Sequence, residues 1–137
     1  MHGDKLIAVL NSWLGQEKRC REVRDPSVAE IHELLDALDG SVCTELSISR
    51  GEESLEYLGI GGGPQRFLVA GELESGELLQ LQSESGEGRE QEVVLDVGGQ
   101  EGKFSQADLV DKEAARWAVE QFVNEFPQGL GHPWDVS

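Results

Sequence analysis

Cysteine and long apolar runs are both scarce in this chain of 137 residues. Cys20 and Cys43 are the two cysteines, and neither a Cys-x-x-Cys pair nor a Cys/His cluster accompanies them. This spacing argues against a zinc site or a disulfide-stapled scaffold, so we expect two free thiols and no metal or other cofactor. No apolar run approaches about 18 residues, the length of a membrane-spanning helix, and the run at residues 6–10 is too short for a secretory signal. We therefore expect a cytoplasmic protein without a membrane partner.

Positive charge is scarce as well. Lysine and arginine number 11 against 27 aspartate and glutamate residues, which gives a net charge of −16. Proteins that bind duplex nucleic acid need lysine and arginine to displace counterions from phosphate, so no nucleic-acid partner is expected. The densest basic stretch is interrupted by Glu17 and Glu22, and we interpret residues 16–24 as a solvated connector or a frayed helical turn. Its basic residues are Lys18, Arg19, Arg21 and Arg24.

Motifs that would carry catalysis are missing. No Gly-x-Ser-x-Gly elbow occurs, and none of the three histidines adjoins a cysteine or serine nucleophile. The glycine-rich stretch at residues 59–65 lacks the third glycine of a dinucleotide fingerprint, because Pro64 stands there, and a strand-like run at residues 67–69 follows it. We interpret this stretch as a bulge or turn between two strands. The sequence therefore predicts no catalytic residues and no enzyme activity.

Apolar residues recur at helical spacing in two segments. The first helix is predicted over residues 25–40, where Asp25 is suited to the N-cap and Pro26 to the first helical position. The second helix is predicted to follow Asp111 as its cap and to end before Pro127. The tail beyond it is irregular, and we expect it to fold back onto the body of the protein.

Alternating apolar and polar residues, bounded by turn residues, predict the strands. A brief apolar run predicts a first strand before the first helix. Residues 98–103 are predicted to form a turn-rich link. Because the strands follow one another with short turns, the sequence predicts an α+β fold. We expect residues 1–137 to form a single domain, an antiparallel β-meander of about five to six strands with an N-terminal and a C-terminal helix packed on one face. The predicted strands are residues 6–10, 44–50, 55–60, 66–70, 78–82 and 92–97.

Acidic residues are concentrated between residues 72 and 92, which hold seven glutamates against Arg89. Solvated strand faces and turns explain many such residues, but this density also predicts a negative surface on which a basic protein docks. We expect glutamates of the hairpin to steer the partner and a large aromatic residue to anchor it. The candidate partner-binding residues are Glu72, Glu74, Glu77, Tyr57 and Trp134.

Three segments together resemble a known family. They are GGGPQRFLV at residues 61–69, VGGQ at residues 97–100 followed by Phe104, and EAARWAVEQF at residues 113–122 with Trp134 downstream. In this order and spacing they resemble the actinobacterial branch of the first-numbered immunity protein family of bacterial polymorphic toxin systems, over about residues 42–134. The resemblance implies a small cytoplasmic α+β protein that binds and neutralises a cognate toxin domain, often a nucleic-acid deaminase.

The expected function is therefore inhibition of a basic toxin domain by occlusion of its substrate-binding or active-site surface. A generic acidic chaperone or adaptor, which would bind a basic protein segment, is the alternative. We expect the chain itself to be a monomer or a weak dimer.

Overall fold

The computed structural model of the chain describes residues 6–50, 56–83, 91–97, 100–124 and 134–137. The segment between the predicted strands 44–50 and 55–60 lies outside these ranges, as do most of the segment between the predicted strands 78–82 and 92–97 and the end of the second helix at Pro127. In chain order the elements are β1 (Leu6–Leu14), β2 (Glu17–Arg24), α1 (Val28–Asp36), β3 (Cys43–Arg50), β4 (Tyr57–Gly62), β5 (Phe67–Glu72), β6 (Leu78–Leu81), β7 (Glu92–Val97), β8 (Gln100–Ser105), the 3-10 turn Gln106–Asp108, α2 (Lys112–Val123) and β9 (Trp134–Val136).

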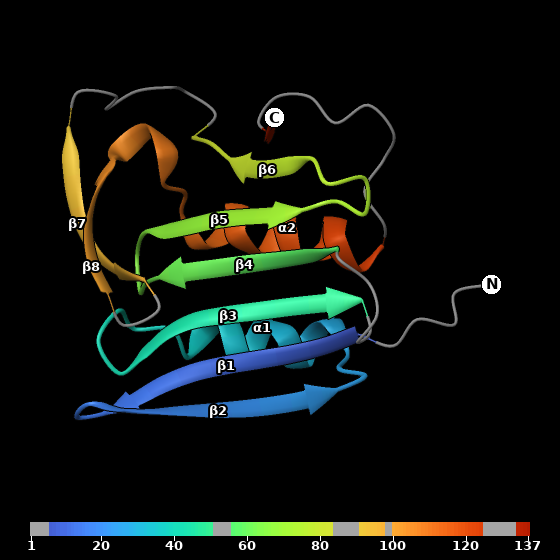
Figure 1. The fold of residues 1–137 in the computed structure, drawn as a ribbon, viewed down its shortest axis with the longest axis horizontal. Coiled ribbons are helices and arrows are strands. Elements are labelled where there is room, and N and C mark those ends of the chain that lie inside the picture. Colours follow the sequence, from blue (N-terminus) through green and yellow to red (C-terminus); the bar gives the residue numbers. More distant parts are fainter. Residues whose placement is uncertain (1–5, 51–55, 84–90, 98–99, 125–133) are drawn as a thin grey trace.

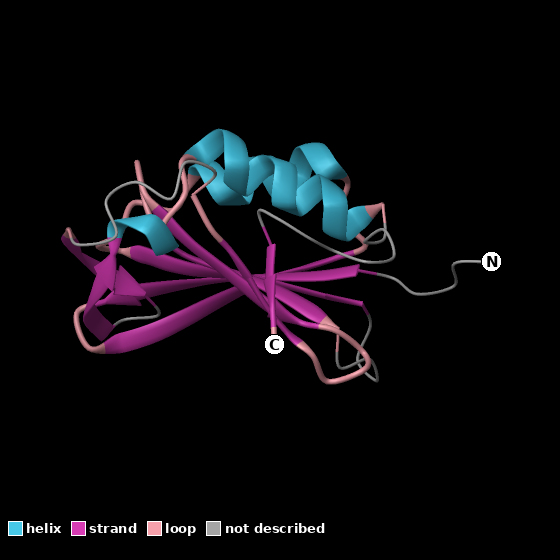
Figure 2. Ribbon diagram, turned by 90° about the horizontal axis from the view of Figure 1, so that it is seen from above, coloured by secondary structure: helices cyan, strands magenta, loops and turns pink. Residues whose placement is uncertain are grey.

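The fold is α+β, as the sequence predicts. Among the described residues, seven strands form one sheet in the order β2-β1-β3-β4-β5-β6-β9, and β7 and β8 form a separate two-stranded sheet at one end of it (Figure 1). All pairings are antiparallel, and strands β3 to β6 follow one another as a meander. Helices α1 and α2 lie side by side on one face of the large sheet, and no described helix covers the opposite face (Figure 2).

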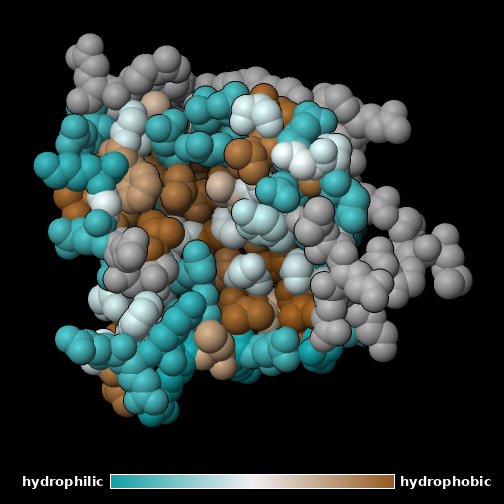
Figure 3. Space-filling model, in the orientation of Figure 1, coloured by the Kyte–Doolittle hydropathy of each residue, from teal (hydrophilic) through white to brown (hydrophobic). Residues whose placement is uncertain are grey.

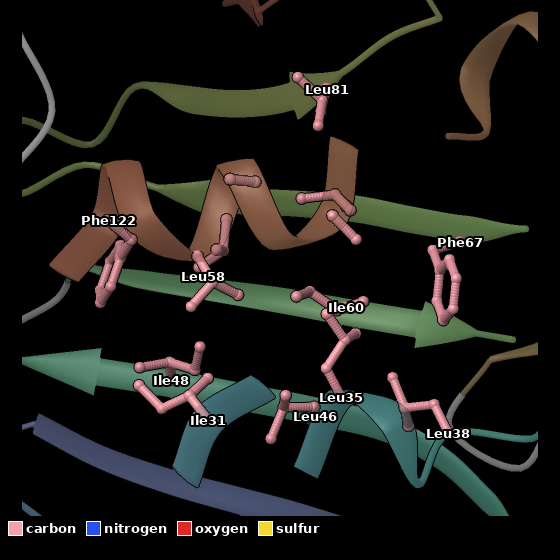
Figure 4. Packing of buried hydrophobic residues seen from close by; sticks show 14 of the residues in the cluster. Ile31, Leu35, Leu38, Leu46, Ile48, Leu58, Ile60, Phe67, Leu81 and Phe122 are labelled. Atoms are coloured by element: carbon pink, nitrogen blue, oxygen red, sulfur yellow. The ribbon is translucent and has the colours of Figure 1, made fainter. Parts of the chain in front are cut away.

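The hydrophobic core fills the space between the helices and the large sheet. Strand alternation sends every second side chain of β3, β4 and β5 toward the helices, where these side chains are completely buried. Leu35 of α1 lies beside Leu46 and Ile60 of the sheet (Figure 4). Each fully buried aliphatic side chain contributes about 1.5–3 kcal/mol, so this single layer of contacts is the main stabilising feature of the fold.

The first helix begins two residues later than the sequence analysis predicts. Ser27, and not Asp25, is the N-cap: its hydroxyl accepts a hydrogen bond from the backbone of Glu30 at 3.1 Å, and the Glu30 carboxylate accepts one from the Ser27 backbone at 3.0 Å. Asp25 adopts a positive φ of 54° in the turn before the helix. The Asp111 cap of α2 is confirmed, since its carboxylate accepts from the Ala114 backbone at 2.9 Å.

Three segments predicted to be irregular are strands. Residues 17–24 form β2, which pairs with β1 along its whole length, instead of a connector or helical turn. Residues 100–105 form β8, and the tail forms β9, which pairs with β6. β2 lies at the edge of the sheet and is exposed almost throughout, so its charged side chains give no apolar periodicity. Charges on an edge strand also discourage pairing with other chains.

The glycine-rich stretch is the end of a strand and a turn, as predicted. Gly62 closes β4, and Gly62 and Gly63 adopt positive φ values of 93° and 101° before the chain enters β5. The peptide bond between Gly63 and Pro64 is cis.

Candidate protein-docking face

The face of the large sheet opposite the helices is the candidate functional site, and we call it the uncovered face. The strand registers arrange its residues in three rows that cross the sheet from β2 toward β6 and β9. The tyrosine row is Arg24, Ile7, Ser49, Tyr57, Glu72 and Leu78; the central row is Glu22, Val9, Ser47, Gly59, Ala70, Gln80 and Asp135; and the glutamate row is Cys20, Asn11, Glu45, Gly61 and Leu68.

The middle of the central row consists of small residues. Ser47 pairs with Gly59, and Gly59 pairs with Ala70, so three adjacent strands carry little or no side chain at this level. The rows on either side carry larger groups, including Tyr57 and Leu68, which rise above this floor. Figure 3 shows the uncovered face, where apolar and neutral surface lies in the middle and polar residues lie around much of it.

Carboxylates dominate the charge of the uncovered face. The three rows give it Glu22, Glu45, Glu72 and Asp135, whereas the basic residue of these rows, Arg24, lies on the edge strand β2. Glu45 accepts a hydrogen bond from the Asn11 side-chain nitrogen at 3.0 Å, which orients its carboxylate. Away from β2, the face therefore combines an apolar and neutral centre with negative charge at its margins.

The structure brings together two of the predicted partner-binding residues. Tyr57 and Glu72 are direct cross-strand neighbours, and Glu72 also pairs with Leu78 across the β5–β6 hairpin. Tyr57 is 41% exposed and Leu78 is 51% exposed, so a hydrophobic surface lies next to the Glu72 carboxylate. Glu74 and Glu77 lie in the turn of the same hairpin and are exposed.

Trp134 does not serve as the exposed anchor that the sequence analysis expects. Its side chain is 5% exposed, because pairing of β9 with β6 turns it into the core, where its ring centroid lies 6.0 Å from that of Trp117. The expected folding back of the tail is confirmed. The prediction of exposure was wrong because a strand of only three residues gives no recognisable sequence pattern.

The sequence analysis does not predict that the β7–β8 hairpin packs against the uncovered face and borders it. Val97 lies over the face at Gly61, and Leu95 lies beside Gly62. A side chain at Gly61 would occupy the space that Val97 fills, which explains the glycine in that strand. The spacing of β7 predicts a strand, but no local signal indicates which surface it packs against.

The groups with shifted pKa values lie near the helices and have structural explanations. Burial would raise the pKa of Asp39, but hydrogen bonds from the backbone of Ser41, Val42 and Cys43 outweigh it and lower the pKa. Burial, followed by the nearby Asp39 charge, raises the pKa of the Cys43 thiol. Asp36 behaves like Asp39: burial opposes the shift, and its hydrogen bonds to charged side chains of α2 lower its pKa.

The remaining chemistry of the described residues is limited. In ranges 6–50, 56–83, 91–97, 100–124 and 134–137, no group of three or more histidine, cysteine, aspartate or glutamate side chains is arranged to hold a metal ion. Within these same parts of the chain, no helix has the length and apolar character needed to cross a membrane. Cys20 and Cys43 are both free thiols, as predicted.

Comparison of the chain with protein-family models, with curated proteins and with solved structures finds no match.

Proposed function

We propose that this chain is an immunity protein that binds a basic toxin domain and occludes its substrate-binding surface, as the resemblance to the first-numbered immunity family implies. The observation that supports the proposal best is the uncovered face, whose apolar and neutral centre lies next to the acidic β5–β6 hairpin. An exposed aromatic and aliphatic centre with a charged rim is typical of protein interfaces. The net charge of −16 favours a partner of opposite charge.

The proposed mechanism is competition with a nucleic-acid substrate. A deaminase that acts on DNA or RNA needs a basic surface for the phosphate backbone and a pocket for the target base. Carboxylates at the margins of the uncovered face pair with that basic surface, while its apolar centre packs against the protein around the pocket. The bound immunity protein then excludes the substrate without any chemical step of its own.

A co-expression assay tests the proposal. The protein that the tagged chain captures from its native lysate is identified by mass spectrometry and expressed in a sensitive bacterial host, alone and together with this chain, and colony formation is counted. Restored growth, together with recovery of a one-to-one complex from the same cells, is the expected result. Unchanged killing in cells that contain the folded chain would refute the proposal, and recovery of varied basic clients without rescue would favour the chaperone or adaptor function.

The association rate tests the role of the acidic hairpin. Charge reversal of Glu72, Glu74 and Glu77 to lysine changes the net charge by six units and should slow association by about 10-fold or more at low salt, with a smaller effect at high salt. The matched control reverses Glu113 and Glu120, which are exposed on α2 in the helical layer, together with the exposed Glu33 of α1. Equal slowing by both triple variants would assign the effect to net charge and would exclude the hairpin as the steering surface.

A further inference from the structure

Gly59 occupies a position where the fold itself gives no reason for a glycine. It lies in the interior of β4, a central strand of the large sheet, where glycine is unfavourable because it has no side chain to pack and loses the most backbone freedom. Its φ lies outside the left-handed region, and an added Cβ would meet the carbonyl oxygen of Ala70 at 3.6 Å, an ordinary van der Waals distance. A Cβ therefore fits among the described residues around this position.

Two nearby glycines behave differently. A Cβ on Gly61 would overlap the side chain of Val97, and a Cβ on Gly71 would overlap the backbone oxygen of Tyr57. Internal packing thus explains both of these glycines, of which Gly61 lies in β4 and Gly71 in β5. Among the described residues, no atom would overlap a Cβ on Gly59, and its row neighbours Ser47 and Ala70 are also small.

A glycine without an internal reason in a strand is typical of a site where another backbone approaches closely. From this placement we infer that Gly59 is the floor of the docking site, over which a backbone segment of a basic protein partner passes. The inference rests on the proposed function and identifies the surface and the contact by which the toxin domain is bound.

The charges around Gly59 define the chemistry of the segment. Glu45 and Glu72 lie on opposite sides of the central row, separated by two strand spacings and four residues along the strands, which places their Cα atoms about 16 Å apart. Lysine or arginine side chains on either side of the partner's close-approach point can therefore pair with both carboxylates. Tyr57 and Leu68 flank the floor and provide apolar contact for the stems of these side chains.

A second copy of this chain is a poor occupant of the same surface. Each copy carries a net charge of −16, so two uncovered faces, both with carboxylate margins, would repel each other. A basic partner removes this repulsion and gains the pairing with Glu45 and Glu72. Charge complementarity therefore selects the basic protein partner.

Graded filling of the floor tests the inference. The probe is the toxin domain identified by the co-expression assay, purified from the co-expressed complex, and Kd is measured by isothermal titration for wild type and for Gly59→Ala, Gly59→Val and Gly59→Trp. We expect affinity to fall with the size of the side chain and Kd to rise at least about 100-fold for Gly59→Trp. The matched control is Ala37→Trp, which adds the same bulk at an exposed position beyond α1 in the helical layer and should leave Kd within about twofold of wild type.

The outcomes separate this inference from the proposed function. If wild type binds and rescues growth while Gly59→Trp, shown by thermal unfolding to be folded, binds equally well, the docking surface lies elsewhere and the proposed function stands. If Gly59→Trp does not fold, Ala70→Phe fills the same floor from the adjacent strand, and wild-type affinity in that variant overturns the inference. If wild type itself does not bind the toxin domain at low salt, the proposed function is refuted and this inference with it.

Discussion

Two glycines of β4 provide a sharp test of how the sheet is packed. Gly59→Ala adds a methyl group where it fits, so it should stabilise the fold by about 0.5–1 kcal/mol through higher strand propensity and a less flexible unfolded chain. Gly61→Ala adds the same group against the side chain of Val97, so the β7–β8 hairpin must shift. Overpacking of this kind destabilises proteins by about 1–3 kcal/mol. The two substitutions are two residues apart on one face, yet they should act in opposite directions.

Urea unfolding measures this contrast. With an m-value of about 2 kcal/mol/M, the two variants should differ by about 1 M or more in their unfolding midpoints. Combining Gly61→Ala with Val97→Ala should restore part of the lost stability, with a coupling energy of about 0.5–3 kcal/mol in the double-mutant cycle. If Gly61→Ala were as stable as Gly59→Ala, or if the cycle showed no coupling, the packing of β7 on β4 would be refuted, and with it the argument that Gly59 alone lacks a structural reason.

Three further predictions concern stability. Trp134→Ala should lower the free energy of unfolding by about 3–5 kcal/mol in urea titration, because the indole is 5% exposed and packs on Trp117; a loss below about 1 kcal/mol would contradict its burial. Ser27→Ala should cost about 1 kcal/mol in the same assay by removing the capping box of α1, and no change would show that Ser27 does not cap the helix. Asp39 has a folded pKa below its unfolded value of about 3.9, so its contribution is present above that pH and is lost as the pH falls through the folded pKa. The thermal midpoint of Asp39→Asn should therefore depend less on pH than that of wild type below about pH 4, and identical slopes between pH 2 and pH 5 would refute the role of its backbone hydrogen bonds.

Segments with a strong local pattern could be predicted from the sequence. β3 alternates apolar and polar residues, and α2 combines a capping Asp111 with an apolar stripe, so each forms the expected element. The meander and the placement of both helices on one face follow from short turns between successive strands. The pairing of Tyr57 with Glu72 is a consequence of the antiparallel β4–β5 connection.

Segments whose structure depends on distant contacts could not be predicted. β2 carries charges on both faces because it is an edge strand, and it exists because β1 offers it a complete ladder of hydrogen bonds. Trp134 is buried because β9 pairs with β6, more than fifty residues earlier in the chain. The different roles of Gly59 and Gly61 depend on where Val97 lies, and the sequence has no local signal for that contact.

Hydroxyl-radical footprinting of Tyr57 tests the central claim most directly, because Tyr57 is the single tyrosine of the chain. The oxidation rate is measured by mass spectrometry in the free chain and in the complex with the toxin domain, and Trp117, 38% exposed in the helical layer, serves as the internal control. The account predicts that complex formation slows oxidation of Tyr57 by about fivefold or more and leaves Trp117 unchanged. Unchanged oxidation of Tyr57 in the saturated complex, or protection of Trp117 alone, would contradict the assignment of the uncovered face as the docking surface.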